Sequence, residues 1–260
     1  MNIVPQVEHR LEKARPADKK GAAHPGCSAC SLRKICISGT LDEREIKHFE
    51  TLVSGKRRIA RHAGLLRKHE TLDKLYVVRS GQFKLTLEDA AGQRRVAEFY
   101  LPGDVMGLDA IANGQHNYEL VALEGSEVCE IPFDRIVSMM SVEPAIQRQF
   151  MKIMSVSLND AFNRSFLLAA SLEERFSGFL LRLADKYGRL GYSSKSFRLG
   201  MPRGDIGSYL GTSVESVSRL VARFNAHGAV AINGRMVELR DWGYLHAVTS
   251  RDDQVLQRAA

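Results

Sequence analysis

The stretch from 203 to 222 reads RGDIGSYLGTSVESVSRLVA, and it decides the fold of the C-terminal part of the chain. Counted from its first residue, positions 4, 8, 15 and 18 are apolar, as they must be where the two helices of a helix-turn-helix pack together. Position 5, at which the helices cross, is Gly207, and position 9, which needs a left-handed backbone, is Gly211. The stretch therefore predicts a helix-turn-helix whose second helix has Thr212 or Ser213 as its N-cap.

The second helix of this motif should expose polar side chains that can read DNA. Arginine donates two hydrogen bonds to guanine, glutamate accepts one from cytosine, and serine can do either. The candidate DNA-binding residues are Glu215, Ser216, Ser218, Arg219 and Arg223. Downstream, Ala229–Leu239 has the pattern of a β-hairpin, with Asn233-Gly234 suited to a type I′ turn. We interpret this hairpin as the wing of a winged helix, which a helical hairpin in an unrelated core would not explain.

Upstream, the sequence between about 57 and 133 has the pattern of short strands. Leu75–Arg79, Phe83–Leu87 and Arg95–Leu101 are separated by turns at Ser80-Gly81 and Ala91-Gly92. Short strands at this spacing, with glycine in the turns, predict a sandwich or barrel of the jelly-roll kind.

A long helix is predicted between Phe133 and Ala170, where turn residues are absent apart from Pro144. Apolar residues recur there every seven positions, which favours a dimer seam, although a helix packed only on its own β-domain is the alternative. The predicted dimer interface consists of Met151, Met154, Leu158, Ala161 and Leu168. The residues on other faces, which could cover the sheet, are Ile146, Phe150, Ile153 and Phe162.

The composition is that of a soluble globular protein, with 44% hydrophobic and 26% charged residues among 260. No run approaches the roughly 18–20 apolar residues that a membrane helix needs, and the N-terminus lacks the pattern of a signal peptide. We therefore expect a cytoplasmic protein without a membrane partner. The net charge of +7 is uneven, because residues 61–172 hold 12 Lys and Arg against 14 Asp and Glu while both ends are basic. This distribution suits a polyanionic partner, but on charge alone a generally basic surface explains it equally well. The double-stranded DNA partner is expected from the helix-turn-helix.

Four cysteines form a three-plus-one pattern. Cys27, Cys30 and Cys36 lie on one short stretch, and Cys129 follows much later. Disulfides are not expected in a reducing cytoplasm, whereas four thiolates can enclose one metal centre. Zinc would accept four thiolates too, but zinc sites are usually built from two close pairs, so the pattern leans towards iron–sulfur.

Five motifs together resemble a known family. The cysteine triad is followed by LDKLYVVRSG at 72–81, PGDVMGLDAI at 102–111, VCEIPF at 128–133 and RGDIGSYLG at 203–211. In order and spacing these resemble the fumarate and nitrate reduction regulator (FNR) branch of the cyclic-AMP receptor protein superfamily, over about residues 24–240.

The resemblance implies an oxygen-responsive global transcription regulator of anaerobic metabolism. It implies a [4Fe-4S] cluster on the four cysteines and a homodimer that binds DNA only while this cluster is intact, because oxygen converts it to a [2Fe-2S] form and the dimer dissociates. It also implies that Glu215, Ser218 and Arg219 read a TTGAT half-site, two of which form a palindrome. The loop that would contact RNA polymerase consists of Ala90, Ala91, Gly92, Gln93 and Arg94.

One position departs from the family pattern. Relatives often carry an acidic residue on the dimer seam, whose repulsion keeps the clusterless form monomeric. This chain has Ala161 there, with Asp160 beside it. The departure affects the expected monomer–dimer switch and leaves the cluster expectation unchanged.

Three other functions are alternatives for this sequence. Binding of a cyclic nucleotide normally needs an arginine for the phosphate, and no Arg or Lys stands between Val96 and Asp134, where His116 is the one candidate cation. We therefore expect no cyclic nucleotide. An enzyme would need a general base and a pocket beside the cysteines, and no such pattern accompanies them. A zinc-stabilised or thiol-redox transcription regulator of the same superfamily remains the alternative.

The predicted fold is α+β in four parts. Residues 1–40 form a flexible arm with the cluster-binding loop, and residues 41–138 form a β-roll (jelly-roll) sensor domain that begins with a short helix. The N-cap of that helix is expected at Thr40 and its capping-box glutamate at Glu43. Residues 139–170 form the dimerisation helix, and residues 171–260 form the winged helix-turn-helix domain.

Overall fold

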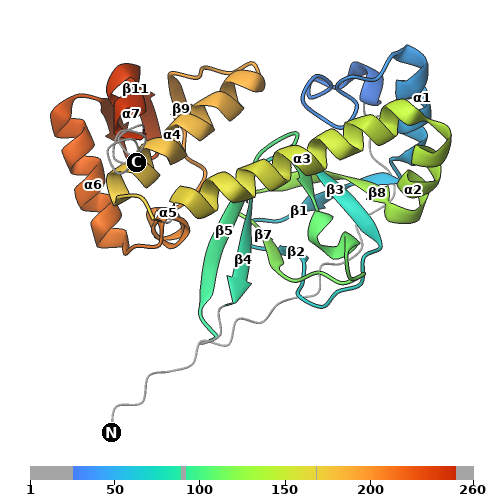
Figure 1. Cartoon of the computed structure of the whole chain (residues 1–260), viewed down its shortest axis with the longest axis horizontal. Coiled ribbons are helices and arrows are strands. Elements are labelled where there is room, and N and C mark those ends of the chain that lie inside the picture. The colour runs from blue at the N-terminus through green and yellow to red at the C-terminus, as the bar shows by residue number, and fades with distance from the viewer. Residues whose placement is uncertain (1–25, 89–91, 168, 250–260) are drawn as a thin grey trace, which may run out of the picture.

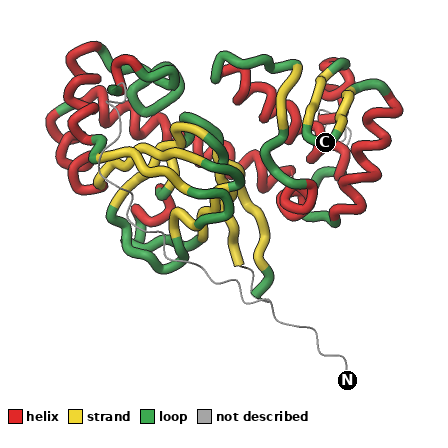
Figure 2. Tube along the Cα trace, turned by 180° about the vertical axis from the view of Figure 1, so that it is seen from behind, coloured by secondary structure: helices red, strands yellow, loops and turns green. Residues whose placement is uncertain are grey.

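The computed structural model describes residues 26–88, 92–167 and 169–249 of the chain. Figure 1 shows a β-roll with helices at one end, the long helix α3 (Pro144–Leu167) lying across it, and a second helical domain beyond. Seen from behind in Figure 2, the strands of the β-roll and of the second domain form separate groups. The predicted α+β class is confirmed.

The cysteine loop leads into the first long helix of the described residues. It begins with the short helix η1 (Cys27–Ala29) and continues in turns up to helix α1 (Glu43–Leu52). The N-cap of α1 is Asp42, whose carboxylate accepts from the Glu45 N–H at 2.8 Å while the Glu45 carboxylate accepts from the Asp42 N–H. The expectation of Thr40 as the N-cap was wrong, because the Thr40 hydroxyl donates instead to the Gln149 side chain at 2.8 Å.

Two four-stranded antiparallel sheets form the β-roll. One has the order β1-β8-β3-β6 and the other β2-β7-β4-β5. Their bounds are β1 (Gly55–Ile59), β2 (Gly64–Leu66), β3 (Lys74–Ser80), β4 (Phe83–Glu88), β5 (Arg94–Tyr100), β6 (Val105–Met106), β7 (Glu119–Ala122) and β8 (Ser126–Pro132), with the short helix η2 (Leu108–Ile111) between β6 and β7. Buried side chains such as Val78, Phe83 and Leu120 form one cluster between the sheets, which is the core of the roll.

The predicted long helix is divided in two. Helix α2 (Phe133–Val142) ends before Pro144, at which α3 begins. A proline cannot donate the backbone hydrogen bond that would continue the first helix, but it suits the first turn of the second. Ile146 and Phe150 of α3 are buried in a cluster with Phe49 of α1 and Ile131 of β8, so the prediction that they cover the sheet is confirmed.

The C-terminal domain has helices packed around a small sheet. It contains α4 (Leu172–Arg189), β9 (Ser196–Arg198), α5 (Arg203–Leu210), α6 (Val214–His227), β10 (Val230–Asn233), β11 (Met236–Leu239) and α7 (Trp242–Thr249), and its sheet has the order β10-β11-β9. Its core includes Phe176 and Phe224, whose ring centroids lie 5.4 Å apart. The same cluster extends onto Phe99 of β5, so this domain is docked on the β-roll.

The wing hairpin is present, but its turn differs from the expectation. Asn233 pairs with Met236, so Gly234 and Arg235 are the two turn residues. Gly234 has φ +59°, whereas neither Asn233 nor Arg235 has a positive φ. Glycine with positive φ at the first turn position is the pattern of a type II′ turn, and the predicted type I′ turn at Asn233-Gly234 was wrong.

In the part of the chain that the structure describes, helices are too short or too polar to cross a bilayer.

Candidate nucleic-acid interface and metal centre

Helices α5 and α6 form the helix-turn-helix that the sequence predicts. Gly211 has φ +68° and ψ 37°, the left-handed conformation that ends α5, and a Cβ atom on Gly207 would lie only 2.9 Å from the carbonyl oxygen of Thr212. Of the two N-cap candidates, Ser213 caps α6, because its hydroxyl accepts from the Ser216 N–H at 3.2 Å. The four predicted packing residues are all buried, namely Ile206, Leu210, Val217 and Leu220.

The predicted base-reading residues lie together on the outer face of α6. Glu215, Arg219 and Arg223 are exposed, and Ser216 and Ser218 are half-buried. The Arg219 guanidinium donates to the Ser216 hydroxyl at 3.0 Å, which holds it along the helix.

Two ion-pair or hydrogen-bond contacts connect this face to other helices of the domain. Arg223 forms an ion pair of 2.8 Å with Glu173 of α4, and Arg203 of α5 donates to the Ser218 hydroxyl at 3.3 Å. Near the start of α6, hydrogen bonding from the Glu215 N–H and from Ser213 holds the pKa of Glu215 below its usual value. Glu215 therefore stays an anion that can accept a hydrogen bond from a base.

The four cysteines converge on one place although they come from two parts of the chain. All are half-buried, three on the N-terminal loop and Cys129 on β8, and none is in a disulfide. Each thiol lies within electrostatic reach of the other three. Burial, followed by the charges of neighbouring cysteines, raises the pKa of Cys27 to about 12 and that of Cys129 to about 11. Burial also raises the pKa of Cys36.

The spacing of these thiols bears on the metal they would hold. Among the described residues, no three His, Cys, Asp or Glu side chains stand close enough together to hold a metal ion as they lie. A single zinc ion with Zn–S bonds of about 2.3 Å would draw its thiolates to within about 4 Å of each other. An iron–sulfur cluster binds each thiolate through a different iron atom and suits a wider arrangement. Four thiolates are a suitable donor set for an iron–sulfur cluster and for a zinc ion, so the chemistry of these residues fits either metal centre.

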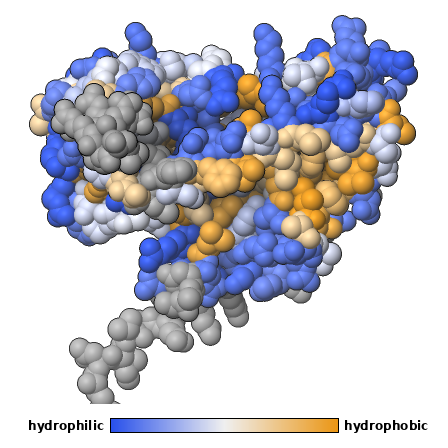
Figure 3. Space-filling view, viewed as in Figure 1, coloured by the Kyte–Doolittle hydropathy of each residue, from blue (hydrophilic) through white to orange (hydrophobic). Residues whose placement is uncertain are grey.

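The predicted dimer interface lies on the outer face of α3. Met151 is 64%, Met154 37% and Leu158 56% exposed. Figure 3 shows hydrophobic side chains gathered along the face of this helix. Ala161 is half-buried, and the side chain of Leu168 lies outside the described residues. Phe162 is 56% exposed, so the expectation that it covers the sheet was wrong.

The candidate polymerase loop is only partly described. Ala90 and Ala91 lie outside the described residues. Gly92 has φ +76°, Gln93 is exposed, and Arg94 pairs with Glu119 at 3.2 Å.

The interior of the β-roll holds the one cation that the sequence offered for a cyclic phosphate. His116 is 1% exposed, and its Nδ1 atom lies 3.1 Å from Asp109. Burial would raise the pKa of Asp109, but hydrogen bonds from His116, the Asn117 N–H and Tyr118 outweigh it and hold the pKa below its usual value. His116 is thus engaged with a carboxylate of its own domain.

Sequence reasoning missed the contacts that link α3, and the residue just before it, to the N-terminal segment. Gln149 is 9% exposed and accepts from Thr40, and His48 of α1 lies 2.7 Å from the Glu143 carboxylate. The available signal for the first contact was the position of Gln149, which stands at helical spacing within the apolar stripe of Ile146, Phe150 and Ile153.

A β-roll joined by a long helix to a winged helix-turn-helix defines a DNA-binding transcription regulator. In agreement, residues 56–143 match the family model described as cyclic nucleotide-binding domain, and residues 174–248 match the Crp-like helix-turn-helix domain. The structure is similar to that of FixK2 from Bradyrhizobium japonicum, with a TM-score of 0.70, 25% sequence identity and coverage of 76% of this chain and 98% of that chain.

Similar proteins identify the family to which the chain belongs. The chain is 35% identical to the fumarate and nitrate reduction regulatory protein of Escherichia coli (strain K12), over 83% of this chain and 86% of that protein. It is 35% identical to the anaerobic regulatory protein of Haemophilus influenzae (86% and 87%), and 39% identical to the transcriptional regulatory protein btr of Bordetella pertussis (85% and 90%). The chain therefore belongs to the CRP/FNR family, whose members are transcription regulators and not enzymes.

Proposed function

We propose that this protein is an oxygen-responsive global transcription regulator that holds a [4Fe-4S] cluster on Cys27, Cys30, Cys36 and Cys129. With the cluster intact it binds a palindromic TTGAT-type site as a dimer and activates or represses genes of anaerobic metabolism. The observation that carries the proposal is the convergence of four half-buried thiols from two parts of the chain. The names of relatives such as the anaerobic regulatory protein of Haemophilus influenzae support it.

The cysteine loop is connected to the dimerisation helix by polar contacts. When bound, the cluster supplies an oxygen-labile centre that ties the loop to β8. Thr40, four residues after Cys36, donates to Gln149 on the buried side of α3, and His48 pairs with Glu143 just before it. A change in the loop thus alters the support of a helix whose outer face carries Met151, Met154 and Leu158.

DNA recognition is assigned to the outer face of α6. Glu215, Ser218 and Arg219 read the bases of each half-site, and Arg223 lies a turn further on, where it meets phosphate. The loop from Gly92 to Arg94, with the residues before it, contacts RNA polymerase. We expect no cyclic nucleotide, in keeping with the pairing of His116, the one candidate partner for its phosphate, with Asp109.

Absorption of the anaerobically purified protein tests this proposal. We expect a broad band near about 420 nm that changes on exposure to air, together with loss of binding to a TTGAT palindrome. A colourless protein that contains one zinc per chain and binds DNA equally well in air would contradict it. That result would favour the zinc-stabilised regulator, which also fits four thiolates.

A further inference from the structure

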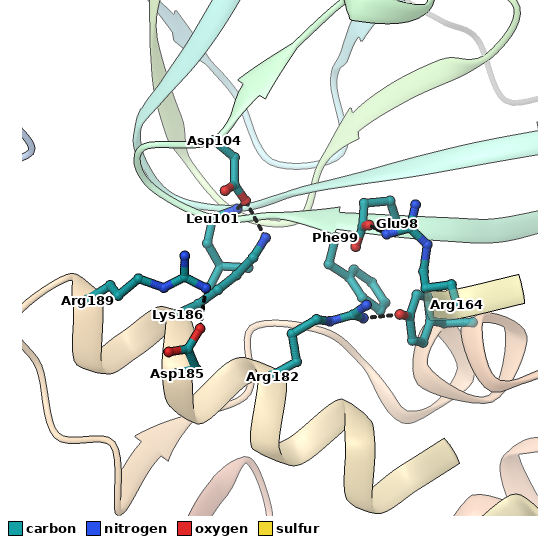
Figure 4. Close-up of polar contacts among 10 residues, drawn as sticks. Glu98, Phe99, Leu101, Asp104, Arg164, Arg182, Asp185, Lys186 and Arg189 are labelled. Carbon is teal, nitrogen blue, oxygen red and sulfur yellow. Dashed lines mark hydrogen bonds and ion pairs between the residues drawn. The ribbon is translucent and has the colours of Figure 1, made fainter. Parts of the chain in front are cut away.

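The C-terminal half of α3, strand β5 and the DNA-binding domain meet at a cluster of charged side chains, drawn in Figure 4. Arg164 of α3 forms an ion pair with Glu98 of β5, and these side chains are 26% and 14% exposed. Arg182 of α4 donates to the phenolic oxygen of Tyr209 on α5. One small region therefore joins the dimerisation helix, the sensor domain and the helix-turn-helix.

Arg182 occupies the centre of this junction. Burial lowers the pKa of Arg182, and the positive charge of Arg164 lowers it further. The negative charges of Glu98, Asp160 and Asp104 raise it, Glu98 most strongly. A guanidinium withdrawn from water is stable only where hydrogen bonds and opposite charges surround it.

Apolar packing docks the DNA-binding domain at the same place. The ring of Phe99 on β5 lies 5.2 Å from that of Tyr209 and 6.1 Å from that of Phe179. Val96 and Leu101 of the same segment are buried in the cluster that includes the core of the DNA-binding domain.

Polar contacts lie on either side of this packing. Lys186 of α4 pairs with Asp104 at 2.7 Å, and Lys84 of β4 pairs with Asp205 of α5 at 2.7 Å. The Val96 N–H donates to the Ser208 hydroxyl at 2.9 Å. The docked arrangement leaves the reading face of α6 exposed, so it is compatible with DNA binding.

We propose that Arg182 is a positioning residue that holds Tyr209 against β5, fixes the DNA-binding domain on the β-roll and so sets the spacing of the two recognition helices. Half-sites of a palindrome lie about one helical turn of DNA apart, roughly 34 Å, so a tilt of either domain misplaces its helix. Arg182 holds Tyr209 of the helix-turn-helix, and the Tyr209 ring packs on Phe99 of β5. The neighbouring residue of β5, Glu98, pairs in turn with Arg164 of α3. The consequence for spacing rests on the proposed binding as a dimer, whereas the fixed domain orientation does not.

The orientation is tested by the distance between α3 and α6. Spin labels on non-natural amino acids at the exposed positions Lys152 and Ala222 leave the four cysteines untouched. We expect a single narrow distance distribution in the wild type and a broader or shifted one in Arg182→Met. Arg189→Met is the matched control, because this exposed arginine of α4 pairs with Asp185 on its own helix.

An unchanged distance distribution in Arg182→Met would overturn the inference. Where that variant fails to fold, Tyr209→Phe decides, because it removes the hydroxyl that Arg182 contacts and keeps the ring that packs on Phe99. A distribution in Tyr209→Phe as narrow as in the wild type then overturns the inference.

Binding to palindromes with altered spacing tests the consequence for DNA. We expect Arg182→Met to bind the correctly spaced palindrome about tenfold more weakly than wild type and to discriminate less against one or two added base pairs, with single half-site affinity unchanged. Equal dependence on spacing in both proteins would refute the role in spacing. If the wild-type protein binds no such palindrome, the proposed function is refuted. The distance measurement would then still test whether Arg182 fixes the orientation of the DNA-binding domain.

Discussion

At the residue scale, Cys129 is the proposed ligand whose role is least obvious from the sequence, because a lone cysteine in a strand is usually a core residue. Its position on β8, within electrostatic reach of the loop cysteines, favours ligation. We predict that Cys129→Ser loses iron and sulfide after anaerobic purification and no longer activates transcription. Iron and sulfide assays, with Cys129→Ala beside it, measure this. If both variants keep their full content of iron and sulfide, Cys129 is a core residue and not a ligand.

Asp109 is the second residue with a defined energetic role. Its folded pKa is lowered, so it stabilises the protein at pH above its ordinary value of 3.8 and loses that contribution as pH falls through the folded value. We predict that Asp109→Asn lowers the free energy of unfolding by about 1–3 kcal/mol at neutral pH, because His116 and the Asn117 N–H lose a charged acceptor. Denaturant unfolding from pH 7 down to acid should show this difference shrink. A difference that grows in acid would contradict the assignment.

At the scale of elements, the proposed function gives two arginines of helix α6 different roles, one towards the bases and one towards the DNA backbone. Arg219 lies on the reading face beside Ser216, whereas Arg223 lies a turn later and pairs with Glu173. We predict that Arg219→Ala reduces the free energy of DNA binding by about 1–3 kcal/mol and relaxes specificity at one base pair. Arg223→Ala should weaken binding to all sequences alike. Binding to half-sites altered one base at a time measures both effects. If Arg219→Ala loses the same affinity for every half-site, Arg219 contacts the DNA backbone and not a base.

Elements defined by local patterns were predictable from the sequence. The helix-turn-helix follows from two glycines and four apolar positions, and strands β3 to β5 follow from alternation between turns. Errors arose where two local solutions compete. Asp42 and Glu45 form a complete capping box, whereas Thr40 finds a partner 109 residues away in Gln149. Likewise, the pairing of Asn233 with Met236 displaced the turn by one residue.

Sites made by distant segments were less accessible to prediction. The cysteine pattern indicated a common centre because all four ligands are the same residue type. The junction at Arg182 gave no such signal, because an arginine on an amphipathic helix usually faces water. Phe162 was misassigned for a related reason, since periodicity distinguishes the faces of a helix without saying which face is covered.

At the scale of the whole molecule, the outer face of α3 must find a partner, since Met151, Leu158 and Phe162 are each more than half exposed. A second copy of the chain satisfies this need, in keeping with the family. Asp160 is the acid beside the seam position Ala161, and it points about 100° away from that position around α3.

We therefore predict that the clusterless protein stays more dimeric at micromolar concentration than a relative with an acid at the seam. Two carboxylates brought together in a poorly solvated interface repel by about 1–4 kcal/mol, and Ala161 cannot supply this repulsion. Ala161→Asp should convert the clusterless protein to monomers, with the dissociation constant raised about tenfold for each 1.4 kcal/mol. Asn163→Asp is the control, because this exposed position lies about 200° from Ala161 around α3. Sedimentation of the three proteins measures the effect. A wild type that is wholly monomeric without its cluster would show that the repulsion arises elsewhere than at position 161.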